Sequence, residues 1–282
     1  KVFSDDFAFR IPPFQRPYAW TTEQAGELFD DLVAAYDGGK GLDESADPYF
    51  LGSIVLVKGV SADAQVIDGQ QRLTTLTILL SAARCLFPDD VSSNINDYLF
   101  EKGSIITGIP DRPRLKLRPR DQEFFEKYIQ RQLDKSQKTA LLESIAATAG
   151  ADGKSWTHPL IGLSPSHLSD SQTNIRNNFE CLLKRLCAIP PSARLGLIRY
   201  TITKCFLVVV ATPSLNAAYR IFSVLNNRGL DLTHADILKA DILGQVGRDK
   251  EDLYTKKWED KEDEIGRDAF SDLFAHIRMI YA

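Results

Sequence analysis

The segment "VIDGQQRLTTLTILL" (residues 66–80) constrains the fold more than any other part of the chain. Val66 and Ile67 end an apolar stretch typical of a buried strand, whereas apolar residues from Leu73 onward recur every three or four positions, as on one face of a helix. The sequence therefore predicts a strand that ends near Ile67, a tight turn at Gly69 and a helix that begins near Gln71.

Strand patterns concentrate in the first hundred residues, and helical patterns dominate the rest. "YFLGSIVLVKG" (49–59) and "KCFLVVVAT" (204–212) read as strands, and "EQAGELFDDLVAAY" (23–36) reads as a helix. Further helices are expected at about 122–131, 135–149, 169–187, 214–226, 233–247 and 250–281, the last one broken. These patterns predict an α+β fold, with a small mixed sheet in region 1–100 and a mainly helical region 101–282 packed on it. Residues 150–168, rich in glycine, serine and proline, are the expected loop or lid.

Composition limits the class of protein. The formal net charge is −4, so a nucleic-acid-binding surface must gather its positive charge locally. No apolar run approaches the roughly 18 residues of a membrane span, and no signal peptide is found. The four cysteines form no Cys-x-x-Cys pair, which argues against a zinc site or a disulfide framework. We therefore expect a cytoplasmic protein and, because the chain starts at Lys1 and still looks helical at its end, a fragment of a longer one.

Arg72 falls in the first turn of the predicted helix, where exposed backbone N–H groups already make the local potential positive. A cation is unfavourable there unless an anion binds at the turn. Free N–H groups, a glycine that permits close approach and a guanidinium fork all suit phosphate. We therefore predict a phosphate site at Gly69 and Arg72, with Asp68 holding Mg²⁺ or positioning a water. Gln70 and Gln71 would be neutral donors that orient phosphate oxygens or that water.

A structural alternative for this turn stays open from spacing alone. In it, Asp68 caps the helix and pairs with Arg72, while the two glutamines are solvated. Thr74 and Thr75 are expected to be structural, with contact to phosphate or metal as the alternative. Two acidic residues of the first helix are either metal ligands or solvated: Asp30 and Asp31.

The segment "FQRPYAW" (14–20) places a donor fork beside aromatic rings on a backbone stiffened by prolines. Such a segment suits stacking on a base, or contact with a DNA backbone that carries an apolar modification. Gln15, Arg16 and Tyr18 are the predicted DNA contacts, and Pro13 would help to wall a pocket for a phosphorothioate sulfur. The alternative is that the aromatic side chains pack on the following helix, which we expect for Trp20.

A basic stripe, "RPRLKLRPR" (112–120), alternates cations with other residues. In an extended strand all the cations would point to one side, and two leucines would face the core. Each cation can neutralise a DNA phosphate, so we predict backbone contacts without sequence reading. The alternative is an edge strand that its charges protect from aggregation. The stripe consists of Arg112, Arg114, Lys116, Arg118 and Arg120.

The block "LNNRGLDLTHADILKADIL" (225–243) contains helix-end signals. Gly229 suits the residue after a helix, and Asp236 completes a capping-box pattern for the next one, so we expect it to be a cap rather than a catalyst. Asn226, Arg228 and Lys239 remain available for ligand binding.

Four blocks together carry a resemblance to a known family: "IPPFQRPYAW", "YFLGSIVL", "VIDGQQRLTTL" and "IFSVLNNRGLDLTHADILKADIL". In order and spacing they resemble the N-terminal domain shared by GmrSD-type modification-dependent restriction enzymes, the BREX-associated BrxU and the phosphorothioate-sensing SspE, the last being the most similar. The turn also resembles the Gly-x-x-Arg phosphate motif of the ParB and sulfiredoxin group, which implies that fold for the first hundred residues.

The resemblance implies nucleotide hydrolysis, with GTP as the expected substrate and Mg²⁺ as cofactor. Its catalytic residues would be Asp68, Gln70, Gln71 and Arg72, with nucleotide contacts from Gly69, Thr74, Thr75, Asn226, Arg228 and Lys239. Hydrolysis would respond to modified double-stranded DNA and license cleavage by a C-terminal HNH-type nuclease domain. The four histidines are scattered and form no such motif, so we expect this chain to sense and hydrolyse but not to cut. The alternative is a non-catalytic adaptor in which bound nucleotide switches DNA binding.

Overall fold

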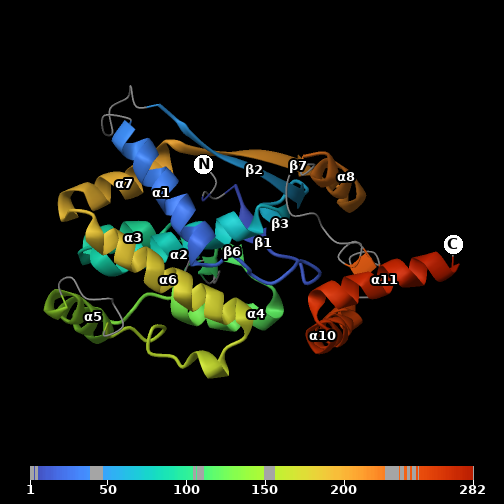
Figure 1. Ribbon diagram of the computed structural model, residues 1–282. Helices are drawn as coiled ribbons and strands as arrows, with labels where there is room; N and C mark the ends of the chain where they lie inside the picture. The colour runs from blue at the N-terminus through green and yellow to red at the C-terminus, as the bar shows by residue number, and fades with distance from the viewer. Residues whose placement is uncertain are drawn as a thin grey trace.

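The computed structural model describes residues 3, 6–38, 47–103, 106, 111–148, 156–225, 235, 238–239, 242, 246 and 248–281. It contains a five-stranded mixed sheet with helices packed around it (Figure 1). The combination of helices with a small mixed sheet predicted from the sequence is confirmed.

The strand order of the main sheet is β6-β1-β3-β2-β7. Its strands are β1 (Ala8–Arg10), β2 (Tyr49–Lys58), β3 (Asp63–Asp68), β6 (Leu115–Lys116) and β7 (Cys205–Thr212). β2 runs antiparallel to β3 and parallel to β7, and β1 runs parallel to both β3 and β6. Two strands thus come from beyond residue 100, so the two predicted regions share one sheet. A separate two-stranded sheet pairs β4 (Phe100–Glu101) with β5 (Arg112–Pro113).

Helix α2 (Gln70–Leu86) forms the centre of the molecule, since 15 of its 17 residues are buried. It packs against α6 (Asp170–Ala188) and α3 (Asp89–Asn96), and α6 also contacts α1 (Thr22–Gly38) (Figure 1). Leu73, Leu76 and Leu80 of α2 belong to the main core, as the periodicity predicts. Burial on every side explains why α2 also carries buried threonines, whose hydroxyls bond to carbonyl oxygens one turn earlier.

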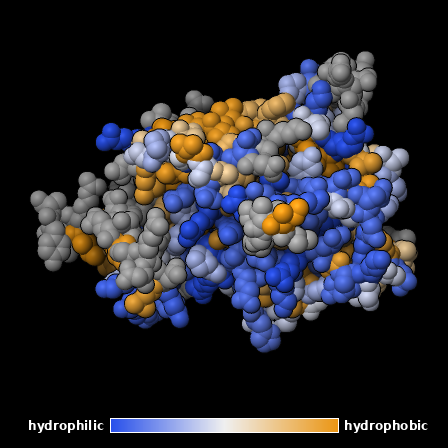
Figure 2. Space-filling view, turned by 180° about the vertical axis from the view of Figure 1, so that it is seen from behind, coloured by the Kyte–Doolittle hydropathy of each residue, from blue (hydrophilic) through white to orange (hydrophobic). Residues whose placement is uncertain are grey.

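Helix α8 (Leu215–Leu225) packs on a different cluster, in which Ala218 and Phe222 contact Val55 of β2 and Ile67 of β3. Farther along β2 and β7 the sheet exposes apolar side chains, including Phe50, and Figure 2 shows an apolar area over these strands. Helices α10 (Arg248–Ile265) and α11 (Arg267–Tyr281) form a hairpin at the other end of the sheet (Figure 1).

Most predicted elements appear where the sequence places them. The break in the last helix is confirmed at Gly266, whose φ is 86°. The helix predicted at 122–131 is α4 (Pro119–Phe125) followed by a π-helix, η1 (Glu126–Gln130), whose last carbonyl groups accept hydrogen bonds from Arg84. Helix α5 (Lys135–Ala147) also matches its prediction, whereas α3 and α7 (Pro191–Thr203) were not predicted. Most of the helix predicted at 233–247 lies outside the described residues.

The predicted loop is described from residue 156 onward, where it contains a 3-10 turn, η2 (Pro165–His167). Trp156, Leu160 and Ile161 are buried in the main core, so this part is a packed loop rather than an open lid. Among the described helices, none is long and apolar enough to cross a membrane.

Candidate functional site

The turn between β3 and α2 is built around Gly69, as the sequence predicts. Its φ and ψ are 92° and 5°, a left-handed conformation that side chains disfavour. A Cβ at this position would lie 2.3 Å from Cγ2 of Ile54 on β2, closer than any real contact. Gly69 is itself the N-cap of α2, so the alternative in which Asp68 caps the helix is wrong. The first turn of α2 contains no acidic residue, so its N–H groups and Arg72 both contribute positive potential there.

Arg72 reaches from the first turn of α2 to the neighbouring strand β2. Its Nη1 donates a hydrogen bond to the carbonyl oxygen of Ser53 at 3.0 Å. The guanidinium lies over Gly52, where a Cβ would be 3.1 Å from its central carbon and from both terminal nitrogens. Gly52 also has a positive φ, 105°, next to a register shift in the pairing of β2 with β7. The strand thus leaves a flat seat for the guanidinium.

The electrostatic surroundings of Arg72 are mixed. Burial lowers its pKa, and electrostatic interaction with Asp68 first, and with Tyr49 second, opposes that effect. The pKa of Tyr49 is itself raised, by burial first and then by Asp31, to which its hydroxyl is hydrogen-bonded. Asp31 therefore lies beside Tyr49, which in turn interacts with Arg72. Asp30 instead pairs with Arg185, so this carboxylate is engaged elsewhere.

Among the described residues, no group of three or more His, Cys, Asp or Glu side chains is arranged to hold a metal ion. Mg²⁺ is commonly held by one or two carboxylates together with substrate phosphates, and it keeps several waters. A single carboxylate at Asp68 therefore fits Mg²⁺ that arrives with a nucleotide, and does not fit a permanent all-protein site.

The two glutamines of the motif bind main chain of the preceding segment. Gln71 accepts hydrogen bonds from the backbone N–H groups of Ala19 and Trp20 at 2.8 and 3.1 Å, and donates to the carbonyl oxygen of Pro17 at 3.1 Å. Gln70 donates to the carbonyl oxygen of Arg16 at 2.7 Å. Both side chains are buried, at 7% and 6% exposure, so they are not solvated. We therefore correct their predicted role: they position residues 16–20 and do not face the phosphate site.

Thr75 and Tyr18 belong to the same buried polar network. Their hydroxyls share a hydrogen bond of 2.7 Å, and Asn178 of α6 donates to the Tyr18 hydroxyl at 2.7 Å. Burial raises the pKa of Tyr18, so the phenol stays neutral. The predicted stacking of Tyr18 on DNA and the predicted ligand contact of Thr75 are therefore wrong. Trp20 packs against the main core, as expected.

Two other predicted DNA contacts are also inside the protein. Gln15 is 4% exposed and donates to the carbonyl oxygen of Ile67 at 2.9 Å, and Pro13 is buried. Neither forms an open pocket for a phosphorothioate, which corrects that expectation. Arg16 alone among the predicted contacts of this segment is half-buried.

A small cavity of about 10 Å³ brings several predicted residues together. This volume is at the threshold for a single water molecule. The cavity therefore lies between residues 14–20, helix α2 and the basic stripe, and it has no room for a ligand. Its lining includes Arg16, Tyr18, Gln70, Thr74, Arg118 and Asp121.

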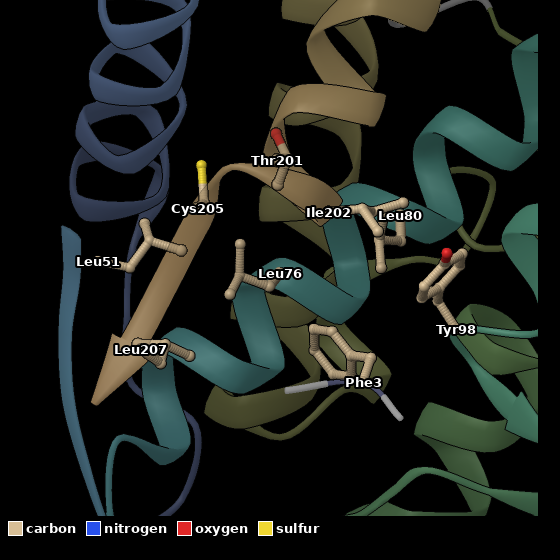
Figure 3. Close-up of a pocket in the computed structure, with 9 residues that line it drawn as sticks. All are labelled: Phe3, Leu51, Leu76, Leu80, Tyr98, Thr201, Ile202, Cys205 and Leu207. Carbon is tan, nitrogen blue, oxygen red and sulfur yellow. The ribbon is translucent and has the colours of Figure 1, made fainter. Parts of the chain in front are cut away.

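A second cavity, of about 40 Å³, lies beneath β2 and β7 next to α2 (Figure 3). Its apolar lining includes Leu51, Leu76, Leu80 and Leu207, and no charged side chain lines it. A triphosphate carries several negative charges, so this cavity does not suit a nucleotide.

The predicted row of five cations is wrong as a single exposed stripe. Two short stretches are extended, β5 and β6, and they pair with different strands. Between them Arg114 is 8% exposed, and its Nε donates to the carbonyl oxygen of Asp97 at 2.7 Å. Arg112 is half-buried and paired with Glu101. Only Lys116 and Arg120 are exposed.

Arg118 belongs to a buried charge cluster that links α4 to α10. It is 5% exposed and binds Asp121 at 2.8 Å and Glu259 at 2.6 Å. Lys239 is 2% exposed and lies 3.4 Å from the same Glu259 oxygen. Burial lowers the pKa of Lys239, and Glu259 opposes that effect. The predicted nucleotide contact of Lys239 is therefore replaced by an ion pair within the protein, and Arg118 is not part of an exposed row of cations.

Asn226, Arg228 and Asp236 lie outside the described residues, so their predicted roles stay predictions. Sequence reasoning missed Gly52 and Tyr49 at the seat of Arg72. A signal for Gly52 was present, because an isolated glycine inside a strand pattern indicates a bulge or a close approach. No comparable signal marked Tyr49.

Comparison with known proteins supports the sequence resemblance. A search of curated proteins finds no matching relative. The family model described as "GmrSD restriction endonuclease, N-terminal domain" matches residues 1–243, which is most of the 282-residue chain. The match includes the Gly69 turn, the seat of Arg72 and the strands that form them. The chain therefore belongs to the family of GmrSD restriction endonuclease N-terminal domains.

Proposed function

We propose that this chain is a nucleoside triphosphatase, with GTP as its preferred substrate, whose activity reports the binding of modified DNA. Its family fits a modification-dependent restriction system, which serves antiviral defence. In the full-length protein, hydrolysis would license cleavage by a C-terminal HNH-type nuclease domain. A ParB-like fold and a particular similarity to SspE are part of this proposal.

One observation carries the proposal: the Gly69 turn brings a guanidinium to the start of α2, whose N–H groups no side chain caps. Gly69 offers no side chain to the first N–H groups of the helix, and no acidic residue follows in the first turn. Burial lowers the pKa of Arg72, which means that its positive charge is incompletely solvated. A phosphate bound at the turn would relieve that cost by pairing with both the guanidinium and the N–H groups.

The roles of the side chains follow from their contacts. Arg72, held at its seat by Ser53 and Gly52, would neutralise charge on the transferred phosphoryl group. Asp68 would hold Mg²⁺ that enters with the nucleotide, and the ion would supply charge neutralisation at the phosphates. Asp31, through Tyr49, would limit how far the Arg72 side chain can move away from the turn.

The glutamines give a physical link between DNA sensing and hydrolysis. Gln70 and Gln71 follow the turn directly and hold the main chain of residues 16–20. A displacement of Arg16 by modified DNA, for which phosphorothioate is the proposed example, would therefore pull on the first turn of α2. Pro13, Gln15 and Tyr18 act in this proposal as the buried support of Arg16.

The test is release of inorganic phosphate from GTP, with CTP, UTP and ATP in parallel, with and without phosphorothioate duplex DNA. Arg72→Ala and Asp68→Ala should each lower release by on the order of 100-fold or more. Arg199→Ala, which removes an exposed arginine on α7, is the matched control and should leave release unchanged. Nucleotide binding without release would refute hydrolysis and favour the non-catalytic, nucleotide-switched adaptor.

A further inference from the structure

Two hollows meet at Pro119 on the side of the molecule that contains β6. The first, of about 640 Å³, crosses β2, β3, β1 and β6, and its lining includes Arg10, Arg112 and Lys116. The second, of about 420 Å³, lies between the start of α4 and α10, and its lining includes Thr255 and Lys256. Because Pro119 lines both, the two hollows adjoin each other.

The first hollow places two cations side by side. Arg10 of β1 and Lys116 of β6 are register partners in adjacent parallel strands, so their side chains point to the same face. Both are exposed, and neither has an ion pair with any described carboxylate. Like charges directly opposite each other destabilise a sheet unless an anion screens them. This pair therefore favours a bound anion.

The second hollow contains two buried hydrogen-bond donors that lack acceptors. Arg118 and Thr255 are 5% and 6% exposed, and within the described chain neither the Nε of Arg118 nor the Oγ1 of Thr255 has a partner. Lys256, the next residue along α10, is exposed and has no carboxylate partner among the described residues. A ligand that only accepts hydrogen bonds and carries negative charge, such as a phosphate, would satisfy all three groups.

Carboxylates in the second hollow do not cancel this preference. Glu259 is engaged by Arg118 and Lys239. Asp260, which is exposed, is the remaining acidic residue of the lining. The described lining of the first hollow contains one carboxylate, Asp63, which lies 3.5 Å from Arg112. Both hollows thus present unpaired cations or donors as well as these carboxylates.

We propose that the two hollows form one track for the phosphate backbone of duplex DNA. Its phosphates would pair with Arg10 and Lys116 in the first hollow, and with Arg118 Nε, Thr255 and Lys256 in the second. The identification of the polyanion as DNA rests on the proposed function. The contacts are all to phosphate, so the track reads no base sequence.

The test is fluorescence anisotropy of a labelled duplex of about 20 bp with the 282-residue chain, without nucleotide, at salt concentrations from about 50 to about 200 mM. The first variant is Arg10→Ala with Lys116→Ala, and the second is Thr255→Val with Lys256→Ala. The matched control is Lys135→Ala with Arg199→Ala, which removes the same charges from exposed positions on α5 and α7.

The first double variant should lower the slope of log affinity against log salt by about two units, and weaken binding at about 0.1 M salt by on the order of 10- to 100-fold. The second should lower the slope by about one unit, and the control should match the unchanged chain. Equal slopes for the track and control variants would overturn the proposal, and so would an unchanged chain that fails to bind at about 50 mM salt.

The binding assay tests this proposal separately from the proposed function, because binding is measured without nucleotide. A chain that binds DNA through the track but releases no phosphate from GTP would refute the hydrolase and leave the track standing. A chain that hydrolyses GTP while both double variants bind like the control would refute the track alone. Millimolar inorganic phosphate is added as a competitor at constant ionic strength. If it abolished all DNA binding, the hollows would be a site for free phosphate, and the DNA track would be overturned.

Discussion

Replacing Gly69 by alanine tests the turn on which the candidate site depends. The new Cβ would meet Cγ2 of Ile54 at 2.3 Å, and Ile54 is fully buried in the core between β2 and α2. Overpacking of this kind costs about 1–3 kcal/mol. A left-handed backbone adds about 1–2 kcal/mol for a residue with a side chain. Gly69→Ala should therefore lower the free energy of unfolding by about 2–5 kcal/mol, a large fraction of the usual 5–15 kcal/mol.

Two other glycines separate these contributions. Gly266 has a φ of 86°, but no described atom lies within 4 Å of the place that an added Cβ would take, so Gly266→Ala should show the backbone cost alone, about 1–2 kcal/mol. Gly59 has neither a positive φ nor a described neighbour within 4 Å, so Gly59→Ala should stay within about 0.5 kcal/mol of the unchanged chain.

The assay is equilibrium unfolding in urea, followed by circular dichroism, for all three variants in the same buffer. If Gly69→Ala destabilised the chain no more than Gly266→Ala, the contact with Ile54 would not constrain the turn. The reasoning that the turn is pressed against β2, and so fixes the position of Arg72, would then fail.

Three further substitutions test neighbouring features. Gln71→Ala removes three hydrogen bonds to residues 17–20 and should cost about 2–4 kcal/mol; hydrogen exchange of the Ala19 and Trp20 amides should accelerate, and unchanged exchange would contradict the assigned role. Gly52→Ala crowds the guanidinium of Arg72 and should reduce phosphate release from GTP, so release at the original rate would contradict the seat. Burial first, and then the charge of Arg84, lowers the pKa of His158 to about 4 in the folded protein, below the value of about 6.5 in the unfolded chain. The folded state therefore holds His158 neutral. The stability that this provides is complete above about pH 6.5 and is lost as the pH falls toward 4. His158→Phe should therefore remove about 2 kcal/mol of the stability difference between about pH 7 and about pH 5, measured by urea unfolding at both pH values.

The sequence by itself determined the elements whose signals are local. The left-handed turn at Gly69, the helix after it, the strand at 205–212 and the helix break at Gly266 all follow from residues within a few positions of each other. Backbone dihedral preferences and the periodicity of apolar residues act over that range, so the chain encodes them without reference to the rest of the fold. The position of Arg72 in the first turn follows from the same local signals.

Only the tertiary structure decided which polar side chains are free to bind a ligand. Gln71 accepts hydrogen bonds from main-chain N–H groups 51 and 52 residues earlier, and Arg118 is paired with a carboxylate 141 residues later. The same distant contacts divided the basic stripe into buried and exposed cations, and strand pairing set Arg10 beside Lys116. A period of two fixes which residues share a face, but what covers that face depends on elements far along the chain. Burial and charge pairing are therefore properties of the packed fold, and the local pattern cannot specify them.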